Sequence, residues 1–157
     1  YDIACAQHNS AITYQLDAEE KPIVEVVDFT PNYTEKIYFV YLNKKQNSRH
    51  AIQNYMNKQQ FLTKKTTTIS EITNRLVLSS NLETTTGLLD HHEIILSDIL
   101  EMETVKERLF PDFKGTIKSL GAWGGDFVMV LSKENPTPYF TSKGYETILR
   151  YEEMILI

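Results

Sequence analysis

Three glycines within five residues make the stretch KSLGAWGGDF (118–127) the first place to look for chemistry. Gly121, Gly124 and Gly125 permit positive φ angles and leave backbone N–H groups unobstructed by side chains. Successive N–H groups curled in this way form a concave nest that can hold a phosphate oxygen or a carboxylate. The alternative is a hairpin connection in which glycine only satisfies turn geometry. The apolar ring of Trp123 would cover a ligand or a neighbouring lobe, or cap the core of its own domain.

A carboxylate stands at the second position of the opening stretch YDIACAQHNS. The small residues that follow Asp2 are typical of a helix interior. On one interpretation Asp2 is the N-cap of that helix. On the other it is a base, or an orienting group, that receives the proton of an attacking hydroxyl.

The stretch NKKQNSRH (43–50) leaves one predicted strand and enters a predicted helix. Lys44 and Lys45, with Ser48 at the start of that helix, could contact a phosphate or a substrate carboxylate. The alternative is a solvated connection between strand and helix. The sequence leaves both interpretations open.

Histidine and cysteine residues do not form a metal-binding pattern. His91, His92 and Glu93 are consecutive, and adjacent helical residues point about 100° apart, so together they would chelate one ion poorly. Cys5 is the single cysteine, which excludes an intrachain disulfide and a cysteine-rich zinc site. We therefore predict no metal site among these residues.

The composition is that of an ordinary globular protein, with 41% hydrophobic and 24% charged residues in a chain of 157. A formal net charge of -5 gives no sign of a nucleic-acid footprint or of a basic membrane-binding surface. No apolar run approaches the ~20 residues of a membrane span, and no signal peptide is visible. Together with the single cysteine, these features favour a cytoplasmic protein.

The hydrophobic pattern is interrupted near residues 30–36, at Pro31 and Asn32. The elements predicted before this break are a helix over 2–8 and strands over 11–16 and 22–29. The elements predicted after it are a strand over 36–42 that is covered on both faces, a helix capped by Ser48, helices starting at the capping boxes Thr68–Glu71 and Ser80–Glu83, a short helix in 104–110, strands in 116–120 and 127–132, a short helix to Lys143 and a closing strand within 146–157.

From residue 36 onward the predicted order is strand, helices, strand, strand, helix, strand. This is the split β-α-β order of the ferredoxin-like superfold, an α+β class with an antiparallel sheet and helices on one face. The helix and two strands before the break lie outside that unit. They resemble the end of something larger.

Taken together, YDIACA and the KSLGAWGGDF stretch about 115 residues later resemble motifs of the GHMP small-molecule kinases. The likeness is to a mevalonate- and phosphomevalonate-kinase-like branch whose members carry a Gly-Tyr-Asp-Ile-Ala (GYDIA) stretch. The family's glycine-rich loop, Lys-x-Thr-Gly-Ala-Gly-x-Gly-Gly, matches Lys118, Gly121, Ala122, Gly124 and Gly125. There are two departures: Trp123 stands where a glycine is usual and adds bulk, and Asp126 stands where a glycine often ends the run and adds negative charge.

The resemblance implies the C-terminal portion of a kinase, with residues 1–33 as a remnant of the ATP-binding lobe and residues 34–157 as a ferredoxin-like lobe. The family's other phosphate loop, Pro-x-x-x-Gly-Leu-Gly-Ser-Ser, does not occur in this sequence. That loop and the Mg²⁺ ligands would belong to an N-terminal portion, which makes this piece inactive alone. The residue roles implied are Asp2 as the catalytic group, Gly121, Ala122, Gly124 and Gly125 as ATP contacts, and Lys44, Lys45, Ser48 and Trp123 as substrate contacts.

The implied partners are ATP, Mg²⁺, a small hydroxyl- or phosphate-bearing substrate and the protein's own N-terminal lobe. Two other functions compete with this one. The first is a non-catalytic ferredoxin-like module that binds a ligand or partner, because that fold hosts many functions. The second is an interaction domain that forms a homodimer through an exposed sheet or through Trp123.

Overall fold

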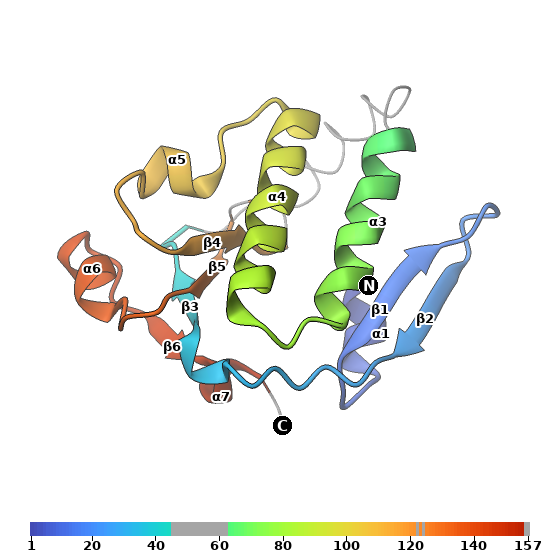
Figure 1. The fold of residues 1–157 in the computed structure, drawn as a ribbon, viewed down its shortest axis with the longest axis horizontal. Helices are drawn as coiled ribbons and strands as arrows, with labels where there is room; N and C mark the ends of the chain where they lie inside the picture. Colours follow the sequence, from blue (N-terminus) through green and yellow to red (C-terminus); the bar gives the residue numbers. More distant parts are fainter. Residues whose placement is uncertain (45–62, 122, 124, 156–157) are drawn as a thin grey trace.

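A four-stranded sheet forms the centre of the structure, a computed structural model that describes residues 1–44, 63–121, 123 and 125–155 (Figure 1). The strands are β3 (Ile37–Tyr41), β4 (Thr116–Ser119), β5 (Phe127–Leu131) and β6 (Ile148–Arg150). Their spatial order is β4-β5-β3-β6, and every neighbouring pair is antiparallel. The β-branched and aromatic residues of these segments suit a pleated, covered surface. The predicted strands at these positions are confirmed.

Alternate residues of the central strand β3 enter two different hydrophobic clusters. Val40 packs in a cluster that includes Phe110 and Phe140, from the end of α5 (Val105–Leu109) and from α6 (Thr137–Ser142). Phe39 packs in the other cluster with Leu89, from α4 (Leu82–Leu100). Successive strand residues point to opposite faces, so β3 is covered on both, as predicted. Helical residues take part in both clusters, so the expectation of helices on one face only is wrong.

The long helices begin at other residues than the sequence pattern indicated. In α4 the cap is Asn81, whose side chain accepts a hydrogen bond from the backbone N–H of Thr84 at 3.0 Å, and not Ser80. Helix α3 (Thr63–Val77) is already helical five residues before the expected cap Thr68. Both errors arise because polar residues that can cap a helix stand in series here, and local pattern does not select among them.

The shorter elements follow the prediction more closely. Helix α5 carries a capping box between Thr104 and Glu107 and ends before Pro111. The closing strand β6 lies within the predicted range 146–157 but pairs over only three residues, and the chain then turns into helix α7 (Tyr151–Met154), which was not predicted. A single turn of 3-10 helix, η1 (Thr34–Lys36), leads into β3.

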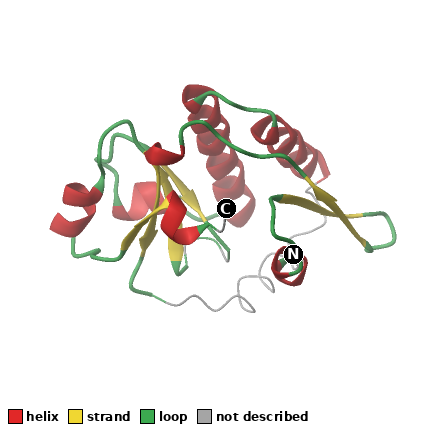
Figure 2. Cartoon of the chain, turned by 90° about the horizontal axis from the view of Figure 1, so that it is seen from below, coloured by secondary structure: helices red, strands yellow, loops and turns green. Residues whose placement is uncertain are grey.

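The first 30 residues form a separate assembly of helix α1 (Asp2–Ala6) and a hairpin of β1 (Ile12–Leu16) with β2 (Pro22–Val26). Figures 1 and 2 both show this hairpin away from the four-stranded sheet. The helix and both strands were predicted from sequence. None of these 30 residues is buried, and the first buried residue is Pro31.

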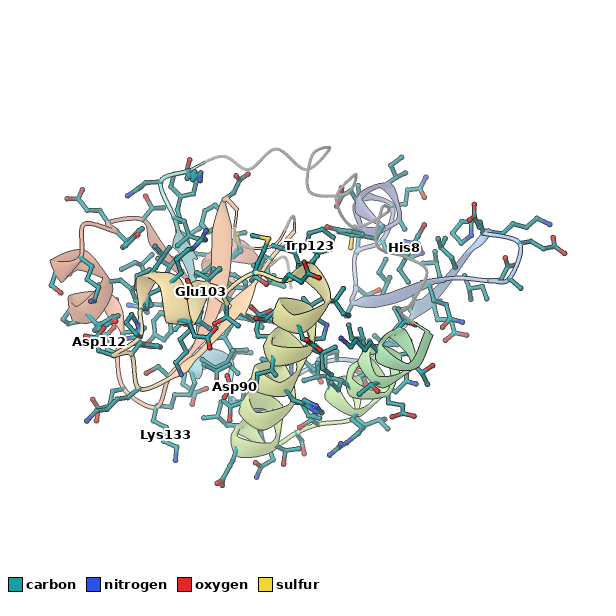
Figure 3. All side chains as sticks on the ribbon, turned by 90° about the horizontal axis from the view of Figure 1, so that it is seen from above. His8, Asp90, Glu103, Asp112, Trp123 and Lys133 are labelled. Carbon is teal, nitrogen blue, oxygen red and sulfur yellow. The ribbon has the colours of Figure 1, made fainter. Side chains whose placement is uncertain are left out.

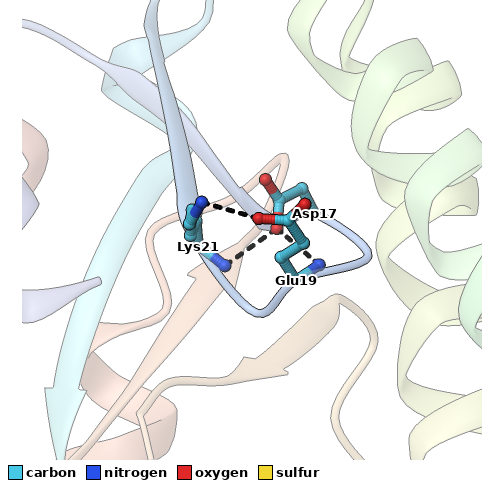
Figure 4. A network of polar contacts seen from close by, with 3 residues as sticks. All are labelled: Asp17, Glu19 and Lys21. Carbon is cyan, nitrogen blue, oxygen red and sulfur yellow. Dashed lines mark hydrogen bonds and ion pairs between the residues drawn. The ribbon is translucent and has the colours of Figure 1, made fainter.

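The turn of this hairpin is held by the side chain of Asp17 (Figure 4). Its Oδ1 atom accepts hydrogen bonds from the backbone N–H groups of Glu19, at 2.8 Å, and of Lys21, at 2.9 Å. The Lys21 ammonium pairs with the Glu19 carboxylate at 2.6 Å. These contacts are all exposed and local, so they define the turn without attaching it to the rest of the protein.

Tyr33 lies on the core side of the break, where it packs with Ile37 and Phe39. Its hydroxyl lies 2.7 Å from the hydroxyl of Thr85 in a buried polar contact. The domain boundary between residues 33 and 34 stays a prediction. Within the described ranges no helix combines the length and the apolar character needed to cross a membrane.

Candidate functional site

The glycine-rich stretch connects β4 to β5, which are consecutive antiparallel partners, so it is a hairpin connection, as one of the two interpretations expected; it spans residues 120–126. Gly121 is exposed and has φ +59, with open space where a side chain would stand. The backbone N–H of Trp123 donates to the carbonyl oxygen of Gly121 at 2.9 Å. Gly125 is buried. The other two predicted ATP contacts, Ala122 and Gly124, lie outside the described residues.

Trp123 packs against its own lobe. Its side chain lines a cavity of about 20 Å³ together with Leu100 and Met102, at the C-terminal end of α4. Figure 3 labels Trp123 near this end of the helix. Its φ of +51 is unusual for a bulky residue and costs of order 1–3 kcal/mol. Of the alternatives drawn from sequence, these contacts favour a cap on the lobe's own core. The substrate contact assigned to Trp123 stays a prediction.

A buried polar network lies at the start of this loop, and sequence reasoning missed it. Glu93 on α4 is 6% exposed, and its Oε1 atom accepts a hydrogen bond from the Ser119 hydroxyl at 2.8 Å. The same oxygen lies 2.9 Å from the ammonium nitrogen of Lys118. The available signal was spacing: Glu93 follows Leu89 by four residues, on the face of the helix that enters the core.

His92 stands beside this network. Burial, with Lys118 nearby as the second cause, lowers the pKa of the His92 imidazole to about 4. Its Nδ1 atom is buried and has no hydrogen-bond partner among the described residues. The ring is therefore neutral near pH 7. The positive charge next to the loop belongs to Lys118, which Glu93 neutralises.

The end of β3 lies beside the exit of the glycine-rich loop. The backbone N–H of Leu42 donates to the carbonyl oxygen of Asp126 at 2.7 Å. Asn43, with φ +55, donates through its side chain to the carbonyl oxygen of Gly144 at 3.1 Å. The next residue, Lys44, is exposed. The fold thus brings the segment that leads into Lys44, a predicted substrate contact, next to the loop. Two more of the predicted contacts, Lys45 and Ser48, lie outside the described residues.

Asp2 is the first residue of α1, and the N-cap position is occupied by Tyr1, so the N-cap interpretation of Asp2 is wrong. The Asp2 side chain is exposed. Every hydrogen bond and ion pair described for residues 1–30 has its partner within residues 1–30. Among the described residues of the glycine-rich loop, none makes such a contact with Asp2. The catalytic role of Asp2 stays a prediction.

A second hollow of about 750 Å³ lies at the opposite end of β4 and β5. Its basic residues are Lys106, Lys114 and Lys133, and its acidic residues include Glu83, Asp90 and Asp112 (Figure 3). Asp112 accepts a hydrogen bond from the Tyr139 hydroxyl at 2.7 Å, which lowers the pKa of the Asp112 carboxyl. Burial, with this hydrogen bond as the second cause, raises the pKa of the Tyr139 phenol. Because its walls carry both signs of charge, this hollow indicates no ligand class.

No group of three or more histidine, cysteine, aspartate or glutamate side chains could hold a metal ion within the parts of the chain that the structure describes. The Mg²⁺ ligands expected in an N-terminal portion stay a prediction.

Solved structures of known proteins resemble this fold. The L. major mevalonate kinase in complex with R-mevalonate matches with a TM-score of 0.62 at 13% sequence identity, over 88% of this chain and 47% of that chain. The fold of this chain therefore resembles that of the matching part of this mevalonate kinase. The Lin0012 protein from Listeria innocua matches with a TM-score of 0.54, also at 13% identity, over 78% of this chain and 38% of that one. Protein-family models and curated sequences gave no match.

The chain spans about half the length of the mevalonate kinase that it resembles. At this identity the likeness establishes the fold alone. It agrees with the kinase-like lobe expected from sequence, while the branch with the GYDIA motif stays a prediction.

Proposed function

We propose that this chain is the C-terminal portion of a GHMP-type kinase, which transfers the γ-phosphoryl group of ATP to a hydroxyl or phosphate of a small molecule. The observation that carries the proposal is the match to mevalonate kinase over 88% of the chain. The substrate would be mevalonate-like or sugar-like. The kinase would be cytoplasmic.

The lobe from residue 34 onward is proposed to be a ferredoxin-like split β-α-β unit by its strand order, with helical residues packed on the second face of the sheet as well. The support is the strand order β4-β5-β3-β6 with antiparallel pairing throughout. In chain order, this places the first strand between the third and the fourth, and the second strand outside the third. The connections through α4 and α6 then each join two parallel strands with one strand between them.

Residues 1–33 are proposed to be a remnant of the other, ATP-binding lobe, with Tyr33 at its end packed into the core of the sheet lobe. One face of the β1–β2 hairpin consists entirely of apolar residues, formed by the pairs Ile12–Val26, Tyr14–Val24 and Leu16–Pro22. Tyr14, Leu16 and Val26 on this face are 38%, 55% and 60% exposed. A two-stranded hairpin is marginally stable without cover. The protein's own N-terminal lobe is the partner that we propose to cover this face.

In the proposed reaction Asp2 acts as the base, or as the group that orients the attacking oxygen. Gly121, Ala122, Gly124 and Gly125 hold phosphate oxygens through backbone N–H groups. Lys44, Lys45, Ser48 and Trp123 contact the substrate. Mg²⁺ is held by the N-terminal lobe. Phosphoryl transfer depends mainly on positioning and charge stabilisation, so the present chain alone is inactive.

The decisive experiment compares this chain with a longer form that includes the residues encoded before Tyr1. The longer form is expected to show an ATP- and Mg²⁺-dependent rise in melting temperature, and ADP release with R-mevalonate or a related small alcohol. Asp2→Asn should abolish turnover and keep the thermal shift. The control Asp28→Asn, an exposed carboxylate elsewhere in the same segment, should leave turnover unchanged.

The other outcomes separate the competing functions. A longer form with no response to ATP would contradict the kinase and favour a non-catalytic binding module. A mass that rises with concentration, with no effect of nucleotide, would favour a homodimeric interaction domain.

A further inference from the structure

The Glu93 network converges on the two residues that precede the glycine-rich loop. Oε1 of Glu93 accepts a hydrogen bond from the Ser119 hydroxyl at 2.8 Å and pairs with the Lys118 ammonium at 2.9 Å. The Lys118 ammonium also donates to the carbonyl oxygen of Ser119 at 2.7 Å. The side chains of Glu93 and Lys118 are only 7% and 15% exposed. The pair therefore belongs to the interior and not to the solvated surface.

A buried ion pair is poorly explained by stability alone. Removing two charges from water costs about as much as their attraction returns, and well-packed apolar residues often stabilise the same site equally or better. The hydrogen bonds of an ion pair, unlike apolar packing, are directional, so they fix the position of one element relative to another. Glu93 can contact Lys118 and Ser119 at the same time only when the end of β4 lies at one position along α4.

The loop needs such a fixed starting point, because two of its described residues depart from strand geometry. Gly121 and Trp123 both have positive φ, so no ladder of hydrogen bonds continues from β4 through them. At its exit the loop is already held by the bond from Leu42 N–H to the Asp126 carbonyl. The Glu93 contacts are the corresponding attachment at its entrance.

We propose that Glu93 is a positioning residue for the glycine-rich loop, acting through Lys118 and Ser119 to hold the loop entrance against α4. The statement that the positioned loop receives a phosphate rests on the proposed function; the positioning itself does not. In this arrangement the Lys118 ammonium is the counter-ion of Glu93 rather than of a ligand. The loop's backbone N–H groups then make the contacts to an anion.

Trp123 is the single tryptophan of the chain, so its fluorescence reports on the loop alone. In Glu93→Gln we expect its emission to shift to longer wavelength and its quenching by acrylamide to strengthen. The informative comparison is the double variant Glu93→Leu/Lys118→Met, which removes both charges and keeps the site apolar. This double variant should unfold cooperatively, with a melting temperature equal to the parent's or higher. Its Trp123 emission should still be shifted to longer wavelength, as in Glu93→Gln.

Two further variants complete the test. Asp98→Asn breaks another ion pair of α4, to Lys65, whose side chains are 67% and 40% exposed, and should leave the emission unchanged. Ser119→Ala removes one hydrogen bond of Glu93 and leaves no buried charge without a partner. It should shift the Trp123 emission in the same direction by a smaller amount, and it replaces Glu93→Gln in the test if that variant fails to fold. A double variant with the parent's emission and quenching would overturn the proposal, because the network would then only stabilise the lobe.

Nucleotide binding by the longer form separates this inference from the proposed function. If the parent binds ATP, the double variant should bind about ten-fold more weakly, the loss typical of a residue that orients a contacting group. Equal ATP affinity in the two would contradict the positioning role. If the parent does not bind ATP while Trp123 responds as expected, the proposed function fails and the positioning of the loop by Glu93 stands.

Discussion

The β1–β2 hairpin and the four-stranded sheet are paired equally well and buried very differently. The β1–β2 pair and the β3–β5 pair each align five residues with five. Yet no residue of the hairpin is buried, whereas Val40, Val128 and Val130 of the sheet are fully buried. Strand pairing and core formation are therefore separate properties of this protein. Most of the stabilisation comes from the apolar area removed from water, and of these two regions the sheet buries apolar residues and the hairpin does not.

The largest expected effect lies in the core of the sheet lobe. Phe140 is fully buried, and its ring centroid lies 4.9 Å from that of Phe110 and 5.1 Å from that of Phe113. Phe140→Ala should lower the free energy of unfolding by about 3–5 kcal/mol, because it leaves a cavity among these rings. Urea unfolding measures the loss. A value below about 1 kcal/mol would mean that this core is loosely packed and would remove the contrast with the hairpin.

A smaller effect is expected from adding one methyl group inside the same lobe. A Cβ at Gly115 would lie 2.6 Å from the carbonyl oxygen of Leu131 and 2.6 Å from the Phe113 ring, so Gly115→Ala should destabilise by about 1–3 kcal/mol. The matched control is Gly87→Ala inside α4, where nothing lies within 4 Å. It should stabilise by about 0.5–1 kcal/mol through helix propensity. Changes of the same sign in urea unfolding would contradict this account.

The third prediction concerns pH. Burial lowers the pKa of His92 to about 4, from 6.5 in a model peptide. Between these values the unfolded chain binds a proton that the folded chain does not, so stability falls as pH is lowered from 6.5 to 4. The free energy of unfolding should fall by about 1–2 kcal/mol over this pH range. The loss is smaller than for a fully buried imidazole, because the His92 side chain is only half-buried.

His92→Leu should remove this loss, measured as the change in unfolding free energy between pH 7 and pH 4.5. His91→Leu is the control, because His91 is the adjacent, exposed histidine on the same helix. Equal pH dependence in the His92 variant and the parent would place the acid sensitivity elsewhere in the lobe.

The smallest effect is expected on the hairpin. Val26 is 60% exposed on its apolar face, so Val26→Thr, which keeps the shape of the side chain, should change stability by less than about 0.5 kcal/mol. Amide hydrogen exchange should also be faster in β1 and β2 than in β5. A large loss in this variant would show that another surface covers the hairpin in solution and would break the comparison. The same loss is the expected result in a longer form that carries the N-terminal lobe.

Much of the local structure was predictable from sequence, and the candidate site only in outline. The glycine-rich stretch could be found because Gly121 stands where the backbone needs a positive φ. The burial of Glu93 could be suspected from its place on the inward face of α4. Its partners, Lys118 and Ser119, could not be identified, because they lie 25 and 26 residues further along the chain and nothing in the spacing joins them to it.

By itself the sequence determined where most strands and helices form, because propensity, periodicity and capping act over a few neighbouring residues. The tertiary structure alone decided the order β4-β5-β3-β6, the packing of Trp123 on its own lobe and the exposure of an apolar hairpin face. It also decided that Asn81 rather than Ser80 caps α4. These choices depend on which segments meet, and the burial that selects them sums over the whole folded chain rather than over any short stretch.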